Sequence, residues 1–231
     1  MRLYQNNYLC IVINTKLFII TMKRLLFYVS CLLLLNCMLT ACEESEDEEN
    51  EFADWKNRNE LFFNNQYTNA KERIGQGDNS WRLYLKWSFN ESQGHTPKDY
   101  IVVKVLEEGN KDISPLYTDQ VEVFIQGKLI PSNTFPNGYI FYNSYNDNNM
   151  NPNTASSVWM SADGEDYALS GNKGRYVDGL ATALMHMHLG DHWQVFVPYA
   201  LAYDGASQQD LKIPAYSTLI YDIKLLGIKR P

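Results

Sequence analysis

Hydrophobic residues recur with a helical period in the stretch that follows the acidic run at residues 43–51. The apolar positions are spaced three or four residues apart over most of this stretch, namely Phe52, Trp55, Phe63, Tyr67, Ala70 and Ile74. Such spacing places side chains on one face of an α-helix. The Gly-Gln-Gly-Asp-Asn sequence at 75–79 then ends the pattern. We therefore predict one helix over residues 52–74.

Shorter runs farther along the chain alternate between apolar and polar residues, as half-buried strands do. The first covers residues 81–89, with apolar positions at Trp81, Leu83, Leu85, Trp87 and Phe89. Further strands are predicted at 100–106, 121–127, 194–197 and 218–226, and one short helix at 177–187. The Asn-rich segment 143–157 predicts an irregular insertion or flap. Many short strands with one late helix indicate an antiparallel α+β domain.

The first 42 residues are typical of a targeting segment. Met-Lys-Arg at 22–24 forms a short positive start, residues 25–35 are almost entirely apolar, and Leu-Thr-Ala-Cys follows at 39–42. This order resembles the lipobox of bacterial lipoproteins, in which the Cys42 thiol would accept the lipid. A transmembrane helix is the alternative, but the apolar run is shorter than a bilayer requires. We predict a signal peptide over 1–42, with Met22 as a possible true start, and a lipid anchor in the outer membrane of the cell envelope. The leaflet, periplasmic or cell-surface, stays open.

The residues after Cys42 are strongly acidic, with seven acids among the nine residues 43–51. Mutual repulsion predicts an extended, solvated tether. The run also resembles the surface-export signal of Bacteroidota lipoproteins, although it could be only a spacer. Without the four basic residues of the first 42, the chain keeps 16 basic against 27 acidic residues. Because phosphate backbones repel such a chain, we predict no nucleic-acid partner.

Cysteine and histidine placement argues against redox or metal chemistry in the folded part. Cys10, Cys31 and Cys37 precede the predicted cleavage site, so Cys42 is the one cysteine of the mature chain. A disulfide, a cysteine-ligated zinc and a cysteine nucleophile are therefore excluded there. His186, His188 and His192 are not spaced to converge on one ion. We predict no metal and no cofactor.

Residues 176–228 carry an ordered series of motifs. Val-Asp-Gly-Leu stands at 177–180, Leu-Gly-Asp at 189–191, a strand ends at Pro198, Ala-Tyr follows at 202–203, and Ile-Pro-Ala-Tyr-Ser-Thr-Leu-Ile-Tyr-Asp covers 213–222. This series resembles the signature of the FKBP-type peptidyl-prolyl cis-trans isomerases. The resemblance covers roughly residues 97–230 and is densest over 176–228. It implies a curved antiparallel sheet wrapped around one short helix, preceded here by a helix-strand extension at 52–96.

The same resemblance implies an apolar pocket for a proline ring. The positions that would act on the substrate are Tyr203, whose hydroxyl would meet a substrate carbonyl, Val177, whose backbone N–H would do the same, and Phe141, a pocket wall. The positions that would line the pocket are Ile125, Tyr142, Leu180, Ile213 and Tyr221. Three of them depart from the family pattern: Ile125 stands at a usual Tyr, Tyr142 at a usual Asp and Leu180 at a usual Trp. Most relatives have Phe where this chain has Tyr221.

The predicted organisation is a signal peptide (1–42), an acidic tether (43–51), the helix-strand extension (52–96) and an isomerase domain (97–231). The resemblance implies a peptidyl-prolyl isomerase that assists the folding of exported proteins, with proline-containing polypeptides as partners. Two alternatives stay open. One is a catalytically weak peptide-binding module with a chaperone role. The other is a surface glycan-binding lipoprotein, which the 16 Tyr and 5 Trp residues suggest. The oligomeric state and the packing of the N-terminal helix are also open.

Overall fold

The computed structural model describes residues 51–145 and 156–231. The predicted lipobox with Cys42, nearly all of the acidic tether and most of the Asn-rich segment lie outside these residues. The described residues belong to one compact unit, Glu51–Pro231. Among them, no helix has the length and apolar character needed to cross a bilayer.

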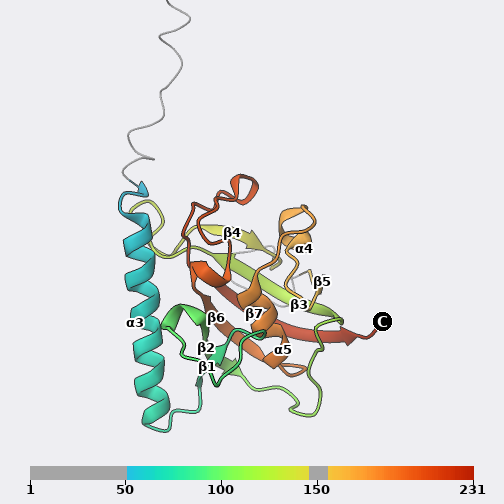
Figure 1. Cartoon of the computed structure of the whole chain (residues 1–231). Helices are drawn as coiled ribbons and strands as arrows, with labels where there is room; N and C mark the ends of the chain where they lie inside the picture. The colour runs from blue at the N-terminus through green and yellow to red at the C-terminus, as the bar shows by residue number, and fades with distance from the viewer. Residues whose placement is uncertain (1–50, 146–155) are drawn as a thin grey trace, which may run out of the picture. The chain divides into compact units, whose positions relative to one another are not determined.

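The first described helix, α3 (Trp55–Gly75), runs along one side of this unit (Figure 1). Its buried positions include Trp55, Phe63 and Ala70, which confirms the predicted apolar face, while Ile74 stays 41% exposed. The indole N–H of Trp55 donates to the Ser217 hydroxyl at 2.9 Å. The helix therefore packs on the same unit as the sheet.

All strand pairs in the described residues are antiparallel, and they form one seven-stranded sheet. The order is β1-β2-β6-β7-β3-β4, with β5 also paired to β3. The strands are β1 (Trp81–Leu85), β2 (Tyr100–Glu107), β3 (Gln120–Lys128), β4 (Ile140–Asn143), β5 (Val158–Ser161), β6 (His192–Val197) and β7 (Leu219–Lys229). The strands predicted at 100–106, 121–127, 194–197 and 218–226 are confirmed as β2, β3, β6 and β7.

The first strand is shorter than the alternation of residues 81–89 predicts. β1 ends at Leu85, which is paired with Tyr100, the first residue of β2. Beyond that pair one more backbone hydrogen bond follows, from the Lys86 amide to the carbonyl of Asp99 before β2, and the Phe89 amide then donates to the Lys86 carbonyl in a turn. Trp87 and Phe89 are consequently 39% and 42% exposed, so their predicted half-buried strand positions are wrong.

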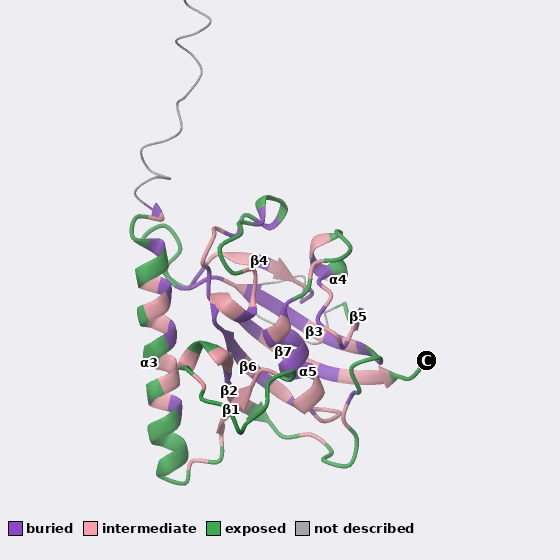
Figure 2. Ribbon diagram, in the orientation of Figure 1, coloured by how far each residue is buried: buried purple, intermediate pink, exposed green. Residues whose placement is uncertain are grey.

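One short helix, α5 (Asp178–His186), lies against β1, β2 and β6 (Figure 1). Leu180 and Leu184 on this helix, and Met187 after it, are completely buried, as are the inward positions of β6 and β7 (Figure 2). The α+β class and the antiparallel sheet around one short helix are confirmed. The remaining short elements are α4 (Tyr167–Ser170), η1 (Pro97–Asp99), η2 (Tyr199–Leu201) and η3 (Gln209–Leu211).

Candidate functional site

Two of the predicted site residues, Phe141 and Tyr221, are in direct contact. Phe141 on β4 meets Tyr221 on β7 edge to face, with ring centroids 5.9 Å apart. β3 lies between β7 and β4 in the sheet, so the two rings meet across β3. The β3 residue at this point is Gly127, which has no side chain to separate them. A Cβ atom at Gly127 would lie 2.3 Å from the Phe141 ring, so only glycine leaves room for the ring.

The other predicted pocket residues join the same hydrophobic cluster. Val177, Leu180, Ile125 and Ile213 are at most 2% exposed, and Tyr142 and Tyr203 pack against the cluster while half-buried. We name these eight residues the Tyr203 cluster: Phe141, Tyr221, Val177, Leu180, Ile125, Ile213, Tyr142 and Tyr203. The positions that the resemblance assigns to a pocket thus all belong to the hydrophobic core of the described unit or pack against it.

The Tyr203 hydroxyl, at a half-buried edge of this cluster, already has a partner. It donates to Oδ2 of Asp166 at 2.5 Å. Burial is the largest cause that raises the pKa of Tyr203, followed by the neighbouring Tyr221 and by Asp166. Asp204, which follows Tyr203, has a left-handed backbone conformation with a φ of 51°, which Asp tolerates better than most residues.

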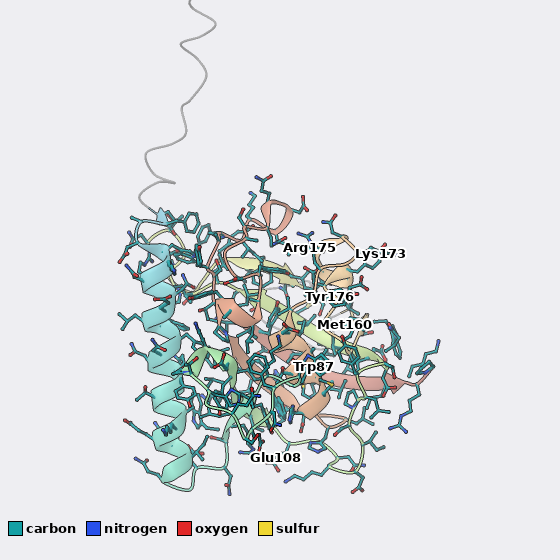
Figure 3. The ribbon with its side chains drawn as sticks, in the orientation of Figure 1. Trp87, Glu108, Met160, Lys173, Arg175 and Tyr176 are labelled. Atoms are coloured by element: carbon teal, nitrogen blue, oxygen red, sulfur yellow. The ribbon has the colours of Figure 1, made fainter. Side chains whose placement is uncertain are left out.

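Asp166 is a functional candidate that the sequence analysis missed. It is fully buried at the start of α4, 37 residues before Tyr203, and no motif marks it. Its Oδ1 accepts from the Ser170 hydroxyl at 3.0 Å and lies 3.9 Å from Nε of Arg175. Arg175, labelled in Figure 3, also donates to the Gln208 side chain. A buried carboxylate is thus held among several donors.

The backbone amide of Val177 is also paired within the chain. It donates to the Gly164 carbonyl at 2.9 Å. Gly164 has a φ of +83°, and a Cβ atom there would lie 2.5 Å from the Val177 carbonyl oxygen, so the close approach requires glycine. Gly164 and Asp166 lie in one segment, and together they accept from both groups that the resemblance assigns to substrate carbonyls.

The remaining polar groups considered for the site are the Tyr142 hydroxyl and three histidines. Tyr142 lies on β4 opposite Gly127, and burial raises the pKa of its hydroxyl. His186 bonds to the Thr182 carbonyl, His188 lies 3.3 Å from Asp191, and His192 lies 2.7 Å from Asp222. Within the described residues no group of three or more His, Cys, Asp or Glu side chains is placed to hold a metal ion.

Several known proteins are similar in sequence to parts of this chain. The macrophage infectivity potentiator of Trypanosoma cruzi is 43% identical to this chain over 53 residues, which cover 23% of this chain and 26% of that protein. The FKBP-type 22 kDa peptidyl-prolyl cis-trans isomerase of Escherichia coli strain K12 is 28% identical over 147 residues, covering 63% and 58%. The chain thus matches less than two thirds of the length of these curated relatives.

Among solved structures, a peptidyl-prolyl cis-trans isomerase from Pseudomonas syringae pv. tomato aligns with a TM-score of 0.45 at 19% identity, over 74% of this chain and 96% of that one. The family model described as FKBP-type peptidyl-prolyl cis-trans isomerase matches residues 111–226, which is half of the chain. That range contains all eight residues of the Tyr203 cluster. The chain therefore belongs to the FKBP-type peptidyl-prolyl cis-trans isomerase family.

Proposed function

We propose that this protein is a peptidyl-prolyl cis-trans isomerase that assists the folding of exported, proline-containing polypeptides. The observation that carries the proposal is the Tyr203 cluster, an apolar and aromatic group with the Tyr203 hydroxyl at a half-buried edge. The reaction needs neither a nucleophile nor a metal, because no covalent bond is made or broken. The site has to remove water from the substrate's X-Pro amide and hold that amide in a fixed orientation.

The barrier to rotation about an X-Pro bond is about 20 kcal/mol and comes from amide resonance. The twisted transition state has less C–N double-bond character and a less polar carbonyl, so an apolar environment favours it over the planar ground state. In our proposal Phe141 contacts the proline ring, and the fully buried Tyr221 supports the Phe141 ring through their edge-to-face contact. Tyr203 donates to a substrate carbonyl and fixes its orientation.

The direct test is a chymotrypsin-coupled assay with a proline-containing tetrapeptide. We expect the protein to accelerate isomerisation and Tyr203→Phe to lower kcat/KM about fivefold, because one neutral hydrogen bond contributes about 1 kcal/mol. Tyr117→Phe, an exposed tyrosine outside the cluster, is the matched control and should leave kcat/KM unchanged. A rate equal to the uncatalysed background would refute the isomerase proposal.

A second candidate is a peptide-binding module with weak catalysis. It is favoured by one observation, namely that the Tyr203 hydroxyl and the Val177 amide both have partners within the chain. A substrate would have to displace these partners before it could use either group. In this case a proline-containing peptide would bind, as measured by calorimetry, while the coupled assay would show no acceleration.

We also propose that Cys42 carries a lipid that anchors the protein in the outer membrane. The support is the order of features at residues 22–42 and the acidic run that follows. In a bacterial host, a labelled fatty acid should be incorporated into the protein, and the protein should sediment with the membranes. Cys42→Ala should lose both the label and the sedimentation, whereas Cys37→Ala should keep both.

A further inference from the structure

Tyr203 lies in the long connection between β6 and β7, residues 198–218, which we name the β6–β7 loop. The backbone of this loop is strained. Of the four non-glycine residues with a positive φ in the described part of the chain, three lie here, namely Asp204, Lys212 and Tyr216, with φ of 51°, 53° and 60°. Such residues keep a left-handed conformation only where surrounding contacts hold them in it. The position of the Tyr203 hydroxyl therefore depends on the contacts that hold the loop.

The backbone on both sides of Tyr203 is bonded to Tyr199. The carbonyl oxygen of Tyr199 accepts from the amide of Ala202 at 3.0 Å and from the amide of Asp204 at 2.8 Å. The carbonyl of Asp204 accepts in turn from the amide of the left-handed Tyr216 at 2.9 Å. Tyr199 and Tyr216 thus place the backbone that carries Tyr203.

Helix α3 holds the side chains of both of these tyrosines. The Tyr199 hydroxyl donates to Oε1 of Glu60 at 2.7 Å. Nζ of Lys56 lies 4.6 Å from the centroid of the Tyr216 ring, which is a cation–π distance. The two tyrosine rings also meet edge to face, with centroids 5.5 Å apart. Lys56 and Glu60 are four positions apart and therefore share the face of the helix that contacts the loop.

Two further residues of α3 fix the end of the loop where β7 begins. Asn59 is completely buried, and its Oδ1 accepts from the Thr218 amide at 2.7 Å. Its Nδ2 donates to the Trp55 carbonyl, also at 2.7 Å. The Trp55 indole donates to the Ser217 hydroxyl. Because a buried amide with partners on both sides cannot move without losing hydrogen bonds, this end of the loop is fixed to the helix.

We propose that α3 is a positioning element for Tyr203, with Glu60 and Asn59 as positioning residues that act through the β6–β7 loop. Without these contacts the loop would relax out of its left-handed conformations, and the Tyr203 hydroxyl would lose its fixed place beside the apolar cluster. The N-terminal helix would then be part of the isomerase site, although it lies outside the range of the family match. This inference rests on the proposed function, because it assigns the Tyr203 hydroxyl to the substrate.

The test is a double-mutant cycle on the full chain with Glu60→Ala, Tyr203→Phe and the double variant, assayed with the proline tetrapeptide. Glu60 is only half-buried, so we expect Glu60→Ala to fold, with Tm lowered by about 2–4 °C for the lost hydrogen bond. We expect its kcat/KM to fall about threefold, because the Tyr203 hydroxyl is less well placed. Glu60→Gln, whose amide oxygen still accepts from Tyr199, should restore kcat/KM to the wild-type value.

In the Tyr203→Phe background, Glu60→Ala should lower Tm by the same amount but should leave kcat/KM at the value of Tyr203→Phe alone. A merely structural role would lower kcat/KM equally in both backgrounds, and that result would overturn the inference. Tyr67→Leu is the matched control, because Tyr67 joins α3 to Tyr100 on β2 and not to the loop, with ring centroids 5.7 Å apart. It should lower Tm and leave kcat/KM unchanged. A loss of kcat/KM equal to that of Glu60→Ala would also overturn the inference.

Amide hydrogen exchange gives a readout that does not depend on activity. Glu60→Ala should speed exchange at the amides of Ala202 and Asp204 about fivefold, whereas Tyr67→Leu should not. Unchanged exchange at these amides would overturn the inference while the proposed function stands. If the wild type shows no acceleration, the isomerase proposal fails, and the cycle is measured as the Kd of the proline peptide. A loss confined to the wild-type background would then support the inference, and equal losses in both backgrounds, or no binding, would overturn it.

Discussion

At the scale of single residues, the site depends on where a side chain is absent as much as on where one is present. Gly127 lies on β3, and the Phe141 ring occupies the space that a Cβ atom would need. Phe141 in turn meets Tyr221 edge to face. An added methyl group would therefore displace a buried ring rather than a flexible exposed chain end, and interiors are packed too closely to absorb it.

We predict that Gly127→Ala destabilises the protein by about 1–3 kcal/mol, the usual cost of overpacking a core. Urea unfolding at neutral pH gives this value. The shifted Phe141 should also weaken the binding of proline-containing peptides. Gly94→Ala is the control, because nothing lies within 4 Å of the added Cβ atom. Equal midpoints for Gly127→Ala and Gly94→Ala would show that the ring accommodates the methyl group.

The burial of residues that lie in sequence motifs could be predicted. The contacts of residues that meet only through the fold could not. Leu180 and Tyr221 fall in ordered motifs and in regular hydrophobic patterns, so the sequence places both in the core. Asp166 has neither signal. Its role arises because chain folding brings α4 to the loop after β6, where Tyr203 meets it. The pairing of Val177 with Gly164 is a backbone contact, which side-chain patterns do not report.

At the scale of elements, the start of α3 is fixed to a distant loop by one carboxylate. Glu51 is 6% exposed and accepts from both the amide and the hydroxyl of Thr134, at 3.0 and 2.8 Å. The side chain of Ser132 is the largest cause that lowers the pKa of Glu51, and both groups of Thr134 lower it further. The ionised form of Glu51 therefore stabilises this junction.

We predict that Glu51→Gln lowers the free energy of unfolding by about 1 kcal/mol at pH 7, because a charged acceptor is lost. In the unfolded chain a glutamate titrates near pH 4.3, and in the folded protein below that value. The stabilisation is thus complete above about pH 4.3 and disappears as the pH falls through the folded pKa. Urea unfolding between pH 2.5 and 7 should show the two proteins converging at low pH.

Glu72→Gln is the matched control for this comparison, since Glu72 is exposed on the same helix. It should leave the unfolding midpoint unchanged across the pH range. A difference between wild type and Glu51→Gln that persists at pH 2.5 would mean that the carboxylate acts through its shape and not through its charge.

Periodicity predicted where α3 and most strands lie, but it could not predict where a strand loses its partner. The alternation of residues 81–89 continues to Phe89, whereas β1 ends at Leu85 opposite the first residue of β2. Strand length depends on the neighbouring strand as well as on the sequence itself. Trp87 is instead placed against the Tyr117 ring, with centroids 4.5 Å apart.

At the scale of the whole molecule, the question is whether α3 covers its own domain or a second copy. Its aromatic side chains find partners within the same chain. The ring of Phe62 lies 6.2 Å from that of Phe196, and the ring of Tyr67 lies 5.7 Å from that of Tyr100. The main apolar side chain left on its outer side is Leu61, which is 63% exposed.

A stable homodimer interface would need to bury roughly 1,200–2,000 Å² of surface and to have an apolar centre. The outer side of α3 offers Leu61 and Ile74, thirteen positions apart, and otherwise mostly polar residues. We therefore predict that the protein beginning at Glu51 is a monomer, with one mass by light scattering from about 10 to 100 μM. Leu61→Glu should leave that mass unchanged. A mass that doubles with concentration and returns to the monomer value in Leu61→Glu would instead establish α3 as a dimer interface.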